Sequence, residues 1–123
     1  MNSLRLEPKN MFRSQLEAIY NLENRINSCE IFIGQKPNWI GTMVLTKPGR
    51  DGISTYDVGL VAIAFFGTTC AIEITSDNGV AEPFMNEIDQ ECSKIVVFDQ
   101  DDFDTLNKFN KNGIEIVLGR RSF

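Results

Sequence analysis

The sequence contains no histidine among its 123 residues. Serine–histidine triads, cysteine–histidine pairs, histidine general bases and the usual zinc sites all need an imidazole, so these chemistries are excluded. Cysteine occurs three times, at positions 29, 70 and 92, and never in a CxxC spacing. Because each cysteine lies in an apolar context, we expect buried thiols in a reducing compartment, the cytoplasm.

The sequence also has no apolar run of the length that a membrane span requires. Its most apolar stretch, Val58–Ile74, has 17 residues and is interrupted by Gly59 and Gly67, whereas a span needs about 20 apolar residues. The first residues show no basic segment followed by an apolar run, so we expect neither a secretory signal nor a membrane partner. The length and a hydrophobic content of 42% predict a single domain, residues 1–123, with its own core.

Basic residues are scarce in the middle of the chain. The segment from Asp51 to Asp104 holds twelve carboxylates and one basic residue, Lys94, while the whole chain has a net charge of −5. A field of this sign attracts cations or a basic protein and disfavours nucleic acid, because it repels phosphate. The alternative interpretation is a solvated acidic face without a partner.

Hydrophobic periodicity predicts a mixed order of helices and strands. Helical spacing of apolar residues extends over 8–27, and shorter helices are expected over 83–92 and 102–111. Asp101 is the expected N-cap of the last helix, and Gly113 is expected to end it in the left-handed conformation. The expected strands are 29–33, 41–46, 58–66, 70–75, 94–98 and 114–118.

The two most apolar strands predict the centre of the fold. In residues 58–66 both alternating sets are apolar, as expected of a strand that is covered on two faces. Gly67 and the two threonines then predict a turn, which gives an antiparallel hairpin. The closing strand, helix and strand form a βαβ unit with parallel strands. We therefore predict an α+β fold with an α/β-like C-terminal βαβ unit, in which an N-terminal helix and further flanking helices surround a mixed sheet.

This element order and three short stretches resemble the restriction-endonuclease-like nucleases, the PD-(D/E)XK superfamily. The stretch YDVGLVAIAFFGTTCAIEIT resembles their active-site hairpin, with Asp57 at the first acid and Glu73 at the second. The stretch KIVVFDQDDFDTLNKFNKNGIEIVLG is similar to the closing strand, helix and strand of Mrr-type restriction endonucleases. GRDGIS resembles the acidic turn of that group, which makes Asp51 an alternative first acid. The resemblance covers roughly residues 50–119.

The resemblance implies a catalytic site that binds Mg²⁺ through Asp57 and Glu73, or through Asp51, and cleaves a phosphodiester of DNA or RNA. The family places a lysine two residues after the second acid, and here that position is Thr75. Either another basic residue fills this role, or the domain keeps the scaffold without hydrolysis. The candidates for the role are Arg50, Lys47 and Lys94. The residues expected to contact phosphate are Arg50, Arg120 and Arg121.

A second hypothesis is a stoichiometric binding protein of the immunity or inhibitor type, which neutralises a basic partner such as a nuclease. Charge complementarity of this kind accelerates association and selects partners. A third is a domain that forms a homodimer through its apolar residues. The run that begins at Asp99 does not match a calcium-binding loop, because Phe103 and Thr105 occupy two ligand positions. The residues expected to bind a basic partner are Glu87, Asp89, Glu91, Asp99, Asp101, Asp102 and Asp104.

Overall fold

The computed structural model describes residues 7–75, 80–88 and 92–120, and it describes the backbone alone for residues 7–12, 47 and 55–58. Three of the predicted site residues, Asp89, Glu91 and Arg121, lie outside the described residues. The elements are α1 (Glu7–Asn27), the 3-10 helix η2 (Glu30–Phe32), β1 (Trp39–Pro48), β2 (Thr55–Phe66), β3 (Thr69–Ile74), α2 (Ala81–Glu87), β4 (Lys94–Val97), α3 (Gln100–Lys108) and β5 (Glu115–Leu118). The fold is α+β, as predicted.

The sheet is mixed, and its strands lie in the order β1-β2-β3-β4-β5. β1, β2 and β3 are antiparallel neighbours, whereas β3, β4 and β5 run parallel to one another. The predicted hairpin of β2 and β3 is confirmed, and it turns through Gly67 and Thr68. Gly67 has a φ of 66°, which the first position of a type II′ turn requires. The predicted parallel pairing of the last two strands is also confirmed.

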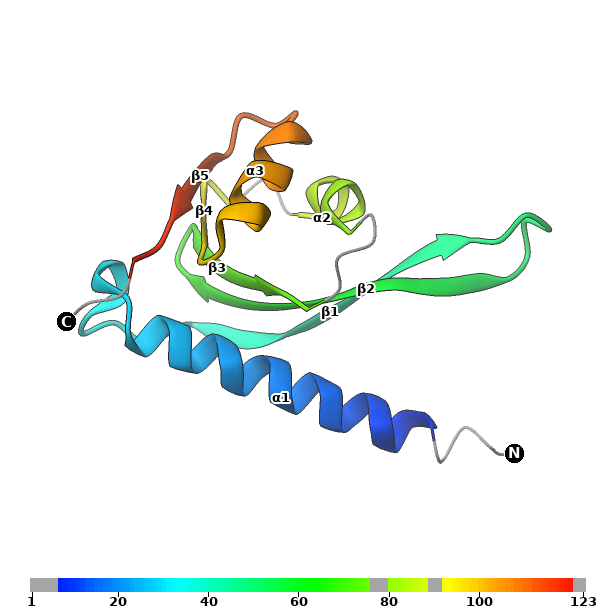
Figure 1. Cartoon of the computed structure of the whole chain (residues 1–123), viewed down its shortest axis with the longest axis horizontal. Coiled ribbons are helices and arrows are strands. Elements are labelled where there is room, and N and C mark those ends of the chain that lie inside the picture. The colour runs from blue at the N-terminus through cyan, green and yellow to red at the C-terminus, as the bar shows by residue number, and fades with distance from the viewer. Residues whose placement is uncertain (1–6, 76–79, 89–91, 121–123) are drawn as a thin grey trace.

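Helices cover both faces of the sheet (Figure 1), so β2 is buried on two sides as predicted. Val61 and Ile63 face a core shared with α2 and α3, while Ala62 and Ala64 face a second core shared with α1. Because the side chains of Ala62 and Ala64 are small, α1 can pack closely against this face, to which it contributes Leu22. None of the described helices has the length and apolarity needed to cross a membrane.

The outer part of β2 forms an arm with β1. Pairing with β3 begins only at Val61, so the backbone of residues 55–59 pairs with β1 alone. The two strands extend away from the body of the molecule in Figure 1. At the tip, the Asp51 carboxylate accepts hydrogen bonds from the backbone N–H groups of Ile53 and Ser54, each at 2.9 Å. Ile53 itself is 88% exposed.

Residues 29–33, predicted as a strand, instead form a tight turn around η2. Cys29 and Phe32 are buried, whereas Ile31 and Ile33 are exposed. The inward residues are therefore three apart, which is the period of a 3-10 helix and not of a strand. Phe32 stacks on Phe66 with ring centroids 4.3 Å apart, and this contact holds the turn against the sheet.

The predicted boundaries of the third helix are also wrong. The N-cap position is Asp99 and not Asp101, which lies in the first turn, and the helix ends at Lys108. Gly113 has the predicted positive φ, 71°, but it belongs to the turn that leads into β5. The Asn110 side chain organises that turn, since its Oδ1 accepts from the backbone N–H of Asn112 and its Nδ2 donates to the carbonyl of Ile114.

Candidate functional site

The register of the sheet separates the two acids of the predicted catalytic hairpin. Glu73 lies opposite Ala62, and Asp57 lies five residues before Ala62, opposite Thr46 of β1. At about 3.3 Å per residue, the two backbone positions are roughly 16 Å apart. Asp51 lies farther along, at the tip of the arm. The backbone therefore does not bring either candidate first acid next to Glu73.

The basic residues considered for the missing lysine lie elsewhere too. Lys94 is the first residue of β4, at the opposite end of the strand from Asp99, and its Nζ is 3.8 Å from Glu115 Oε1. Arg50 follows β1 in the loop at the tip of the arm. The backbone of Lys47 lies in the arm as well. Thr75, at the lysine position, donates its hydroxyl to the carbonyl of Leu60 at 2.7 Å.

Glu73 is held instead by an arginine of the first helix. Its side chain points to the α1 face, because it lies opposite Ala62, and only 13% of it is exposed. Arg25 Nε is 3.4 Å from Glu73 Oε1, although that oxygen accepts no hydrogen bond from a described residue. Burial raises the pKa of Glu73, Arg25 opposes this effect, and the charge of Asp99 adds to it.

Two further carboxylates meet this pair where the parallel strands end. Asp99 follows β4 and its Oδ1 is 3.5 Å from Arg25 Nη1, while Asp102 lies in the first turn of α3. Burial raises the pKa of Asp102 to about 6, helped by the charges of Asp99, Glu73 and Asp101 and opposed by Arg25. We call Arg25, Glu73, Asp99 and Asp102 the carboxyl-edge cluster. The carboxyl ends of parallel strands are where open α/β sheets commonly bind ligands.

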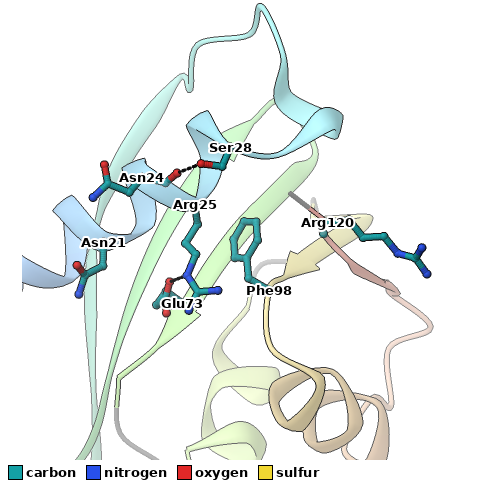
Figure 2. Close-up of a pocket in the computed structure, with 8 residues that line it drawn as sticks. Asn21, Asn24, Arg25, Ser28, Glu73, Phe98 and Arg120 are labelled. Carbon is teal, nitrogen blue, oxygen red and sulfur yellow. Dashed lines mark hydrogen bonds and ion pairs between the residues drawn. The ribbon is translucent and has the colours of Figure 1, made fainter. Parts of the chain in front are cut away.

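A cavity of about 390 Å³ opens beside the cluster. Figure 2 shows Arg25 reaching from α1 toward Glu73 with the Phe98 ring beside it, and Cζ of the arginine lies 6.0 Å from the ring centroid. The side chain of Arg120 extends away from both (Figure 2). The residues that line the cavity are Asn21, Asn24, Arg25, Ser28, Glu73, Phe98, Gly119 and Arg120.

Gly119 lets the chain after β5 pass close to the core below this cavity. A Cβ at this position would lie 2.9 Å from Val96 Cγ1, 3.0 Å from Phe98 Cε1 and 3.1 Å from Cys29 Sγ. The backbone N–H of Gly119 donates to the carbonyl of Val97 at 2.7 Å. Any side chain here would push Phe98 or the end of β5 outward, so the position of Arg120 depends on this glycine.

The acidic residues of the binding hypothesis lie on α2 and around α3. Glu87, Asp101 and Asp104 are exposed, and none of them forms an ion pair with a described basic residue. The charge of Asp101 adds to those of the carboxyl-edge cluster, where Glu73 and Asp99 pair with Arg25. Glu87 ends α2, beside the turn that leads into β5. This part of the surface has an excess of negative charge that a bound cationic group would offset.

The described residues were also compared with the requirements of a divalent metal site. Among the described residues, no three carboxylates or cysteines converge closely enough to form a metal-binding group. The carboxyl-edge cluster is instead built around a guanidinium, which occupies the space between Glu73 and Asp99.

Of the three arginines expected to contact phosphate, the two that the structure describes, Arg50 and Arg120, lie far apart. The β1–β2 loop with Arg50 lies at the opposite end of the molecule from the C-terminal end of β5, which precedes Arg120 (Figure 1). They form no shared basic surface.

Arg25 was missed as a functional residue in the sequence, where it is one of several charged residues on polar positions of a helix. The signal that could have indicated it was Glu73. A carboxylate within an apolar strand needs a basic partner when it is buried. Comparison of the chain with protein families, curated proteins and solved structures finds no match.

Proposed function

We propose that this chain is a cytoplasmic binding domain for a basic protein, on a restriction-endonuclease-like scaffold that does not hydrolyse nucleic acid. The observation that carries the proposal is the charge balance at the carboxyl edge, where the described residues offer one guanidinium, Arg25, to Glu73 and Asp99. Burial raises the pKa of Asp102 in the first turn of α3, and the charges of neighbouring carboxylates raise it further, so negative charges repel one another at this edge. A lysine or arginine of a partner would relieve this repulsion.

The order of the elements supports the scaffold part of the proposal. A helix, three antiparallel strands, a helix, a strand, a helix and a strand follow one another, with α1 on one face of the sheet and α2 and α3 on the other. This arrangement agrees with the resemblance noted in the sequence. It is an argument from fold, which many functions share, and so it says nothing about activity by itself.

The absence of hydrolysis is supported by the positions of the residues that would perform it. Glu73 is bound by Arg25, its expected partner Asp57 lies roughly 16 Å away along β2, and a threonine stands at the lysine position. A nuclease of this class needs both acids on one Mg²⁺ and a nearby positive charge for the phosphate. The chain offers an acidic surface there instead.

Binding of a basic partner is tested with two variants of equal charge change. The first replaces Glu87, Asp101 and Asp104 by their amides, and the matched control replaces Glu17, Glu23 and Glu30, which are also exposed but belong to α1 and η2. The immobilised domain is presented to a cell extract, and the captured basic protein is identified and titrated by calorimetry. We expect the first variant to bind at least tenfold more weakly and the control to bind like the unmodified chain.

Salt and pH give two further readouts of the same proposal. The affinity is expected to fall with ionic strength and to rise as the pH increases through about 6, because Asp102 then becomes ionised. Equal losses in the two charge variants, or an affinity independent of salt, would refute the acidic surface as the binding site.

The hydrolase alternative has its own test. Calorimetric titration with Mg²⁺ and Mn²⁺ is combined with cleavage assays on plasmid DNA and on RNA. We expect no cleavage. Cleavage that is lost in Glu73→Gln would overturn the non-hydrolytic part of the proposal and restore the nuclease. Light scattering on the same samples measures whether the domain forms a homodimer.

A further inference from the structure

Two of the three cysteines touch each other in the core between the sheet and α2. Cys70 lies in β3 and Cys92 lies just before β4, and both belong to the apolar cluster that includes Phe84. Their Sγ atoms are 2.8 Å apart, and the side chains are 0% and 3% exposed. Cys29 lies in the other core, on the α1 face of the sheet. The chain thus contains one thiol pair and one cysteine in a separate core.

A cavity borders one side of the pair. A cavity of about 360 Å³ is lined by Cys92 together with Ser93 and residues 112–114 of the turn before β5. Cys70 does not line this cavity and is fully buried. A small oxidant that enters the cavity therefore meets Cys92 first, and Cys70 lies directly behind it.

The two thiols also interact electrostatically. Contact with Cys92 and burial raise the pKa of Cys70 above its usual range. The Sγ of Cys92 also lies 3.4 Å from the carbonyl oxygen of Lys94, to which it donates. Cys92 is thus fixed between its partner sulfur and the backbone at the start of β4.

We propose that Cys70 and Cys92 form an oxidative modification site, at which a hydroperoxide converts the two thiols into an intramolecular disulfide. In the first step, Cys92 Sγ attacks the peroxide, the O–O bond breaks, and an alcohol or water leaves with the thiol proton. The product is a sulfenic acid on Cys92. In the second step, Cys70 Sγ attacks Cys92 Sγ, the S–O bond breaks, and the departing hydroxide takes the proton of Cys70 as water.

The reaction is balanced. The two thiols lose two electrons and two protons, and an organic hydroperoxide is reduced to one alcohol and one water. Hydrogen peroxide is reduced to two waters. Only a small movement is needed, since the sulfur atoms must approach from 2.8 Å to about 2.05 Å. The bond would close a loop that contains β3 from Cys70 onward and all of α2. It would link β3 to the residue stretch just before β4 and so lower the conformational entropy of the unfolded chain.

The test uses the intact chain, purified with reductant and then treated with hydrogen peroxide. Free thiols are alkylated after denaturation and counted by mass spectrometry, and a digest without reductant locates the crosslink. We expect three alkylated cysteines before treatment and one after it, with the linked peptides containing Cys70 and Cys92. The Tm of the oxidised monomer is expected to rise by about 10 °C and to return to its starting value with reductant.

Two variants make the outcome specific. Cys29→Ser leaves the thiol pair intact and should form the same crosslink. Cys70→Ser should form no crosslink, and its Cys92 should be trapped as a sulfenic acid by dimedone. Three alkylated thiols in the peroxide-treated native chain would overturn the proposal, as would a crosslink that involves Cys29 or joins two molecules. Because the unmodified chain alone decides this, a variant that fails to fold does not obscure the result.

Discussion

Replacement of Asp102 by asparagine is expected to stabilise the domain above pH 6. A pKa of about 6 in the folded chain, against an ordinary value of 3.8, corresponds to about 3 kcal/mol of unfavourable charge. The side chain is only partly buried, so screening by solvent reduces this figure to about 1 kcal/mol. The asparagine removes the charge while keeping the size of the side chain, and the variant should be more stable by that amount.

The pH dependence provides the sharper measurement. Folding raises the pKa of this carboxyl, so its destabilising effect is complete above pH 6 and decreases as the pH falls through about 6. It disappears near the ordinary value of 3.8, because the group is then protonated in the folded and unfolded chains alike. The raised pKa of Glu73 acts in the same direction.

Urea unfolding of both proteins, followed by circular dichroism at pH 8 and pH 5, checks this prediction. We expect the free energies of unfolding to differ by about 1 kcal/mol at pH 8 and by less at pH 5. Asp104→Asn, an exposed carboxylate of the same helix, serves as the control and should change stability by less than about 0.5 kcal/mol at either pH. A variant of Asp102 that is less stable at pH 8, or a difference that does not vary with pH, would refute the reasoning.

Gly119→Ala should lower the free energy of unfolding in urea by about 1–3 kcal/mol, because its Cβ would meet Val96, Phe98 and Cys29 within 3.1 Å. Arg25→Met should cost about 2 kcal/mol by leaving Glu73 buried beside other carboxylates, and adding Glu73→Gln should restore most of the loss in a double-mutant cycle. The carboxyl of Asp51 should titrate at a pKa of about 2 by NMR, because it accepts hydrogen bonds from Ser54 and Ile53, and Ser54→Ala should raise that pKa.

Strong periodicity made most of the fold predictable. Residues 58–66 are apolar on both alternating sets, and the strand is indeed covered on both faces. The closing βαβ unit was readable because short loops join a helix to two apolar strands. Residues 29–33 were misread because the segment is too short to distinguish a period of two from a period of three.

The candidate site was predicted less well, because its geometry depends on register and on contacts between distant segments. Sixteen residues separate Asp57 from Glu73 in the chain, but the spacing does not show that β2 extends past its partner into an arm. The charge on Glu73 was noticed, whereas its partner on α1 lies 48 positions earlier. Charge composition alone indicated the acidic segment, and the fold then gathered part of it at one edge of the sheet.

The strand order has a consequence for synthesis of this protein. Each strand after β1 hydrogen-bonds to the one that precedes it in the chain, so a ribosome delivers every new strand next to the strand with which it pairs. The sheet can then grow by stepwise addition, without threading one segment between two that have already paired. Non-neighbouring pairings slow folding through the entropy of closing long loops, and this topology avoids them throughout the sheet.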